Sequence, residues 1–153
     1  MLKKPGFESN VLKIFRIDNG SESVKLPLYQ SSIKAGFPSP ADDYIEGNLD
    51  ITKFLIQNPA ASFIVQVSGM SMQGAGILHE DYLVVNRAWE PLHEDIVVAS
   101  VDSEFTVKRF LRDEDGIILA PENEAFQPIE ITGEMQLEIW GVVGSSFRRY
   151  RTF

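Results

Sequence analysis

The chain has 153 residues, of which 44% are hydrophobic and 24% charged, with no cysteine and a net charge of −8. These values fit a globular protein with one core of ordinary size, and no apolar run reaches the roughly 18 residues of a membrane span. The lack of cysteine excludes disulfides, thiolate nucleophiles and cysteine-based zinc sites, and the acidic balance disfavours nucleic acid as the main partner.

Charge is spread unevenly along the chain. Residues 1–35 hold six Lys or Arg and three acidic residues, whereas the remainder holds eight basic and nineteen acidic residues. We expect the basic arm to be attracted to the acidic body by weak, screened interactions. No apolar block of the kind found in a secretory signal follows the first basic residues. We therefore expect a cytoplasmic protein without metal or cofactor.

The N-terminal arm is weakly patterned. Residues 10–17 and 24–30 alternate loosely and are predicted to be strands, joined by a polar turn at 18–21. Pro27 confines the second strand to an edge, because proline cannot donate to a ladder of backbone hydrogen bonds. We expect this arm to be mobile, and it is too short for a helix-turn-helix DNA-binding domain.

An extended segment follows at residues 34–40 (KAGFPSP). Two prolines exclude regular helix and disfavour a central strand. The segment fits a linker, and it also fits a protease-accessible stretch in which the small residues Ala35 and Gly36 would enter a narrow pocket.

The rest of the chain is predicted to be mostly β. Asn48 or Asp50 can cap a short helix whose apolar face holds Ile51, Phe54 and Leu55. After Asn58 and Pro59, turn residues separate short runs rich in Val, Ile and Phe at the spacing of a sandwich or barrel. The predicted strands are residues 62–67, 82–86, 95–101, 104–110, 116–120 and 136–143.

Ser71 is the candidate nucleophile, because it follows the apolar run 63–67 within a stretch of small residues (SGMSMQGAG). A serine hydroxyl needs a base to take its proton. His79 and His93 are the usual type of base, but both lie in polar surroundings typical of solvated turns. Glycine-rich residues 74–76 lack the Lys-Ser/Thr pair and the helix of a phosphate-binding loop.

Lys108 is the alternative base. In a regular strand it shares a face with Thr106 and Phe110, whereas Arg109 points the other way. It could equally be a charge that protects an edge strand from aggregation. As a base it must be buried enough for its pKa to fall by about 3 units, because only about one lysine in 2,500 is neutral at pH 7 otherwise.

Several motifs occur in a recognisable order between about residues 34 and 143. They are residues 67–72 (VSGMSM), 76–77 (GI), 81–83 (DYL), 106–109 (TVKR), 121–123 (PEN) and 126–129 (FQPI). Together they resemble the LexA/UmuD family of self-cleaving Ser-Lys proteins, and the short arm with residues 35–44 (AGFPSPADDY) resembles its UmuD branch.

The resemblance implies a compact, β-rich catalytic domain that forms a homodimer. It implies that Ser71 is the nucleophile, Lys108 the neutral general base, and the backbone N–H groups of Met70 and Ser71 the oxyanion hole. It implies self-cleavage between Ala35 and Gly36, promoted by a RecA filament on single-stranded DNA. The arm, residues 1–35, would be removed, and the domain 36–153 would join an error-prone, UmuC-type lesion-bypass polymerase in the SOS response.

Three alternatives remain at this point. The chain could be a LexA-type relative without its DNA-binding domain, or a polymerase-binding module in which proteolysis is only a switch. It could also be a processing peptidase that acts on other proteins, as signal peptidases with Ser-Lys chemistry do, although no membrane anchor is expected here.

Overall fold

A computed structural model describes residues 9–18, 24–29 and 45–151. They form two compact units, the larger containing residues 9–17 and 58–151 and the smaller residues 18 and 24–29 with 45–57. Within the described residues, no helix is both long enough and apolar enough to cross a membrane. Each unit is considered by itself.

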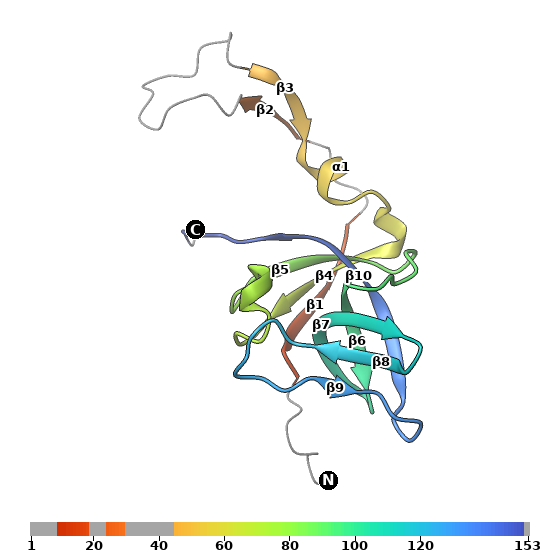
Figure 1. Ribbon diagram of the computed structural model, residues 1–153. Helices are drawn as coiled ribbons and strands as arrows, with labels where there is room; N and C mark the ends of the chain where they lie inside the picture. Colours follow the sequence, from red (N-terminus) through yellow and green to blue (C-terminus); the bar gives the residue numbers. More distant parts are fainter. Residues whose placement is uncertain (1–8, 19–23, 30–44, 152–153) are drawn as a thin grey trace. The chain divides into compact units, whose positions relative to one another are not determined.

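The larger unit is one antiparallel sheet of eight strands in the order β1-β4-β5-β10-β6-β7-β8-β9. The sheet curls on itself (Figure 1), which brings the start of its edge strand β1 against β7, five positions away in strand order. Short 3₁₀ turns at Pro59–Ala61 and Gln73–Ala75 flank β4. The strands are β1 (Val11–Arg16), β4 (Ser62–Val67), β5 (Tyr82–Asn86), β6 (Ile96–Val101), β7 (Glu104–Asp113), β8 (Gly116–Ala120), β9 (Ile129–Glu130) and β10 (Leu137–Phe147).

The long strand β10 lets the sheet bend. Its first half pairs with β6 and its second half with β5, and the register shifts between Ile139 and Gly141 and again between Val143 and Ser145. Such irregularities bend a strand and increase its twist. A side chain at Gly141 would lie 2.7 Å from Val85 Cγ1, so the close approach of β10 to β5 needs glycine here.

The core of the larger unit has two apolar clusters. One lies beneath β4 and the turn that follows it, and includes Val65, Val67, Met72, Leu83 and Val107. The other lies among β6, β7, β8 and β10 and includes Phe110 and Leu119, both fully buried. Because Met72 and Val107 belong to the same cluster, the turn after β4 and strand β7 share one apolar core.

The smaller unit is a two-stranded antiparallel sheet of β2 (Lys25–Tyr29) and β3 (Ile45–Asp50), followed by helix α1 (Ile51–Leu55). Asp50 caps the helix by accepting a hydrogen bond from the Lys53 N–H at 3.1 Å. Pro27 lies in β2, which is an edge strand because the sheet has only two strands.

The prediction of a mostly β fold is confirmed, as are the edge position of Pro27 and the capped helix. Every strand predicted from residue 62 onward is present, and β7 and β10 run further than predicted. The sequence did not predict β3, the two-residue β9, or the pairing of β1 with β4 in the main sheet. The expected mobility of the arm stays a prediction, but residues 11–16 lie in the main sheet.

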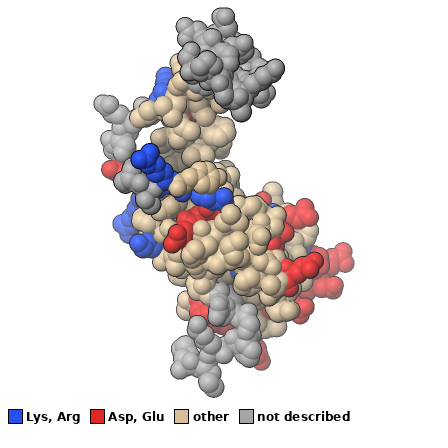
Figure 2. All heavy atoms as spheres, turned by 90° about the vertical axis from the view of Figure 1, so that its left-hand side faces the viewer, with Lys and Arg blue, Asp and Glu red and all other residues tan. Residues whose placement is uncertain are grey.

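Charged side chains divide the surface of the larger unit. In Figure 2 the Asp and Glu side chains gather over one side of this unit, and a separate group of Lys and Arg side chains lies on another. Exposed acidic residues include Asp113 at the end of β7 and Glu114 and Asp115 in the turn that follows, and exposed basic residues include Arg149 and Arg151 after β10. The acidic excess seen in the sequence therefore lies on the surface of the larger unit.

Candidate active site

Ser71 lies in a tight turn that begins where β4 ends. The turn needs a left-handed backbone at Gly69, with φ of 75°, and again at Gly76, with φ of 78°, which glycine adopts without strain. Met72 points into the core and is 2% exposed, and Ser71 itself is only 3% exposed. An apolar strand that stops at a glycine and is anchored again by Met72 thus holds the serine hydroxyl at a fixed place.

The loop after β8 supports this turn from the other side. The Glu122 N–H donates to the Ser71 carbonyl at 2.8 Å, and the Gly74 N–H donates to the Glu122 carbonyl at 2.7 Å. Asn123 Nδ2 donates to the Met70 carbonyl at 2.9 Å. A side chain at Gly74 would lie 2.7 Å from the Glu122 oxygen, so this contact explains the glycine.

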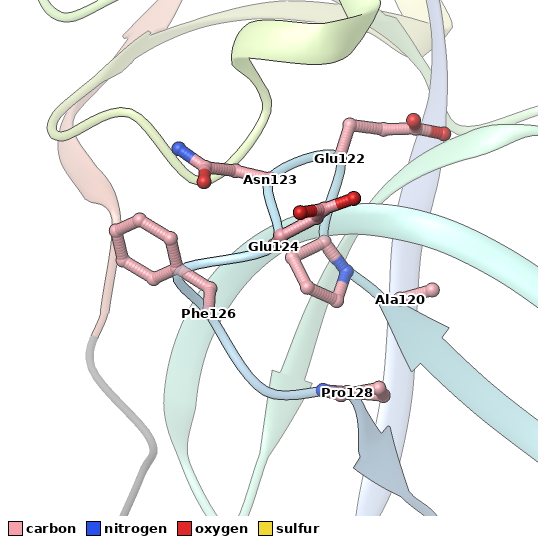
Figure 3. A pocket seen from close by; sticks show the side chains of 7 residues that line it. Ala120, Glu122, Asn123, Glu124, Phe126 and Pro128 are labelled. Atoms are coloured by element: carbon pink, nitrogen blue, oxygen red, sulfur yellow. The ribbon is translucent and has the colours of Figure 1, made fainter.

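The same loop forms a shallow pocket of about 450 Å³ beside the Ser71 turn. Figure 3 shows Asn123 pointing from the loop toward that turn, while Phe126 points in the direction of β1. Glu122 is held by Arg109, whose Nε lies 2.8 Å from Glu122 Oε1. The pocket therefore lies next to the candidate nucleophile, and its wall is tied to β7. Its lining residues are Ala120, Pro121, Glu122, Asn123, Glu124, Phe126 and Pro128.

Lys108 reaches the serine from β7. Its Nζ lies 3.3 Å from Ser71 Oγ, 2.9 Å from Thr106 Oγ1 and 3.1 Å from the Val107 carbonyl oxygen. The side chains of Lys108 and Thr106 share a face, as the sequence predicted. The alternative of a solvated charge that protects an edge strand is wrong, because Lys108 is 5% exposed and its Nζ bonds to groups inside the site.

Burial changes the acidity of this lysine. It lowers the pKa of Lys108 from 10.5 to about 8, because the charged ammonium loses hydration. Within the described part of the chain, no carboxylate forms an ion pair with Lys108. About one molecule in ten then has a neutral amine at pH 7. Burial thus lowers the pKa of Lys108 most of the way to the value near 7 that a general base requires.

Asn10 is a member of the site that sequence reasoning missed. Its Nδ2 donates to Ser71 Oγ at 3.1 Å and to the Val107 carbonyl at 3.2 Å. Its Oδ1 accepts from the Val107 N–H at 2.7 Å and from the Thr106 hydroxyl at 3.2 Å. No local signal marked Asn10, because these contacts join it to residues 61 to 97 positions away.

The predicted oxyanion hole has a suitable backbone. Among the described residues, none accepts a hydrogen bond from the N–H of Met70 or Ser71. These groups lie on a turn whose carbonyls are already bound by Asn123 and Glu122. Their role in stabilising an oxyanion stays a prediction.

The two histidines lie in turns and bond to backbone groups. His79 Nδ1 accepts a hydrogen bond from the Gly69 N–H at 2.9 Å, and His93 Nδ1 accepts one from the Arg112 N–H at 3.0 Å. His79 thus supports the backbone of the serine turn, while the hydroxyl of Ser71 is bonded by Asn10 and Lys108. Ala35 and Gly36, the predicted scissile residues, lie outside the described residues.

An ion pair between buried Asp81 and exposed Arg148 lies at the end of the turn. Asp81, 1% exposed, accepts two hydrogen bonds from Arg148, at 2.5 and 2.6 Å, and one from the Leu78 N–H at 2.8 Å. Burial by itself raises the pKa of Asp81, but the hydrogen bonds from Arg148 and Leu78 outweigh it and lower that pKa. Arg148 also donates to the Gly76 carbonyl at 3.3 Å, so the end of β10 secures the end of the serine turn.

This arrangement of groups suits acyl transfer. It combines a fixed hydroxyl, an amine of lowered pKa within reach of it, and adjacent backbone donors, which are the parts of a nucleophilic site with an oxyanion hole. No group of three or more metal-ligating side chains occurs among the residues that the structure describes.

Several known proteins are similar to this chain. The family model described as Peptidase S24-like matches residues 27–144. Protein ImpA of Salmonella typhimurium is 50% identical over 93 residues, which cover 61% of this chain and 64% of ImpA. Protein MucA of Escherichia coli is 39% identical over 134 residues, covering 87% of this chain and 91% of MucA.

A LexA repressor is also similar. The protein of Hahella chejuensis is 34% identical over 143 residues, covering 87% of this chain and 71% of the repressor. The matched region of the family includes Ser71, Lys108 and the loop 121–128, and extends back through Ala35 and Gly36.

Proposed function

Because this chain belongs to the Peptidase S24-like family, we propose that it is a serine endopeptidase that cleaves its own chain between Ala35 and Gly36. Ser71 is the nucleophile and Lys108 the general base. The observation that carries this proposal is the 3.3 Å separation of Lys108 Nζ and Ser71 Oγ in a buried site that lowers the pKa of the lysine to about 8.

The chemistry follows from this pair. Neutral Lys108 takes the proton of Ser71 as Oγ attacks the carbonyl carbon of Ala35, and the N–H groups of Met70 and Ser71 stabilise the oxyanion. Protonated Lys108 gives its proton to the leaving nitrogen of Gly36, which becomes a new N-terminus, while Ala35 stays bound to Ser71 Oγ as an ester. Water then hydrolyses the ester of Ala35 on Ser71, again with Lys108 as base.

In its cellular role, the protein is proposed to act in SOS mutagenesis in the cytoplasm as a homodimer. Cleavage of the arm 1–35 is stimulated by a RecA filament on single-stranded DNA, and the product 36–153 joins a UmuC-type lesion-bypass polymerase. The likeness to ImpA and MucA across the catalytic body supports this role. The match to LexA over 71% of that repressor keeps a LexA-type relative as the second candidate.

The test is self-cleavage of the purified full chain without partners. A fragment that begins at Gly36 should appear, and its rate should rise nearly tenfold between pH 6 and pH 7 and level off above about pH 9 as Lys108 loses its proton. N-terminal sequencing identifies the bond. Ser71→Ala and Lys108→Ala should each abolish the reaction.

Matched controls come from the same chain. Ser68→Ala changes a serine in the same turn, and Lys53→Ala removes a lysine whose side chain is 80% exposed, so both should still cleave. Cleavage between Ala35 and Gly36 that persists in Ser71→Ala or Lys108→Ala would refute the dyad.

A further inference from the structure

We propose that Asn10 and strand β1 occupy the place beside Ser71 and Lys108 that the scissile segment must enter, so the chain's own N-terminal strand holds back its cleavage. This inference rests on the proposed function, since it concerns access to the same serine. It identifies the occupant of the site as the chain's own residues 10–16.

The side-chain amide of Asn10 imitates a peptide group of a substrate strand. Its Oδ1 accepts from the Val107 N–H and its Nδ2 donates to the Val107 carbonyl, the pair of bonds that a neighbouring backbone would make. β8 pairs with β7 only from Arg109 onward, so this edge of β7 is filled by Asn10 instead of a strand. A substrate backbone at this edge would make the same two bonds.

Asn10 also occupies the space next to Ser71 Oγ that the scissile carbonyl must enter. Attack requires the scissile carbonyl carbon to come within roughly 3–3.5 Å of Ser71 Oγ. Asn10 Nδ2 already lies 3.1 Å from that oxygen and donates to one of its lone pairs. Ser71 is 3% exposed, Lys108 5% and Asn10 8%, so the pair is covered while Asn10 is in place. Asn10 must withdraw before the scissile carbonyl can enter.

Asn10 directly precedes β1, and β1 is attached to the sheet in a way that lets another segment take its place. β1 pairs with the edge of β4 from Val11 opposite Val67 to Arg16 opposite Phe63, and the Asn10 carbonyl accepts from the Ser68 N–H at 2.8 Å. Leu12 and Ile14 remain 49% exposed, so the apolar burial of the strand is limited mainly to Val11 against the core and Phe15 against Tyr82. Backbone ladders place few demands on sequence, and another extended segment can bind the same edge.

The first experiment compares self-cleavage of the full chain at pH 8–9 in the wild type, Asn10→Ala and Leu12→Ser. Asn10→Ala removes all four side-chain hydrogen bonds and should cleave roughly five- to thirtyfold faster. Leu12→Ser, which changes an exposed side chain two residues away, should cleave at the wild-type rate. Asn10→Ala cleaving at the wild-type rate or more slowly would overturn the inference while leaving the proposed function intact.

A second experiment does not depend on cleavage. The chain has no cysteine, so Ser71→Cys provides a single thiol at the site. Its reaction with iodoacetamide, counted by mass on uncut chains, should be faster when Asn10→Ala is added and unchanged with Leu12→Ser. Equal labelling in all three backgrounds would overturn the inference. Faster labelling of the Asn10→Ala background, together with no cleavage of the wild-type chain at pH 10, would refute the proposed function alone.

Discussion

Strands β4 and β1 lie side by side in the sheet, yet different forces hold them. Along β4, Phe63, Val65 and Val67 point into the core and are almost fully buried. Along β1, every side chain except that of Val11 is exposed, and the strand is joined to β4 mainly through backbone hydrogen bonds. Burial of apolar surface fixes β4, whereas β1 relies on bonds that many segments could make.

This difference matters because the two strands serve the same site. β4 leads directly into the turn that carries Ser71, so the nucleophile is placed by a strand whose inner face is buried in the core. β1 carries Asn10, which covers that nucleophile from a strand with little burial. A self-cleaving protein needs this combination, because its catalytic atoms must stay in place while the group that covers them leaves.

The largest expected effect is on the free energy of unfolding, and it compares β4 with β1 at one pair of residues that face each other across the two strands. Val65 and Ile14 are partners in the β1–β4 register, but Val65 is 0% and Ile14 49% exposed. Val65→Ala should lower the free energy of unfolding by about 2 kcal/mol, because it removes buried methyl groups and leaves a cavity. Ile14→Ala should cost less than about 1 kcal/mol, since half of its side chain stays in water.

Urea denaturation monitored by tryptophan fluorescence gives both values. The measurements belong in a Ser71→Ala background, so that no chain is cut during equilibration. Equal losses at the two positions would show that β1 is as firmly packed as β4, and the contrast between the two strands would be wrong.

Local patterns in the sequence were enough to predict the framework of the site. The run 63–67 is apolar and ends at glycine, and the run 104–110 alternates, so both strands and their approximate ends could be found from neighbouring residues alone. The Ser71 turn was recognised for the same reason. The resemblance to the LexA/UmuD family then related Ser71 to Lys108, which the structure places 3.3 Å apart.

The remaining features depend on contacts between distant parts of the chain. Whether Lys108 is solvated or buried was decided by the packing of Asn10 and the Ser71 turn against β7, which local pattern does not encode. β3 contains Gly47, Asn48 and two acidic residues, so its propensity for strand is low, and it forms because β2 pairs with it. Asn10 has no local signature, since its role exists only when β1 lies between β4 and the edge of β7.

The smallest expected effect concerns the cost of keeping Lys108 in this framework. Its folded pKa of about 8 lies below the unfolded value of 10.5, so the folded state disfavours the proton. Burial of the charged lysine therefore lowers the free energy of unfolding by about 3 kcal/mol below pH 8. This penalty fades between pH 8 and pH 10.5 as the unfolded lysine also loses its proton. Lys108→Met removes the charge and keeps most of the volume.

The variant also loses the hydrogen bonds of Nζ to Thr106 and to the Val107 carbonyl, but both acceptors keep a bond to Asn10. We therefore expect Lys108→Met to gain a net of about 1 kcal/mol at pH 7, because the loss of these bonds offsets part of the penalty removed. The gain should shrink above pH 8, vanish near pH 9 and become a loss of about 2 kcal/mol above pH 10.5, where the penalty is gone and only the lost hydrogen bonds remain. Denaturation in the Ser71→Ala background from pH 6 to pH 11 measures this difference, and Lys53→Met, at an exposed position, should show no such pH dependence. A stability difference between the parent chain and its Lys108→Met variant that stays constant across this range would mean that Lys108 folds with its ordinary pKa, and the buried framework would then not prepare it as a base.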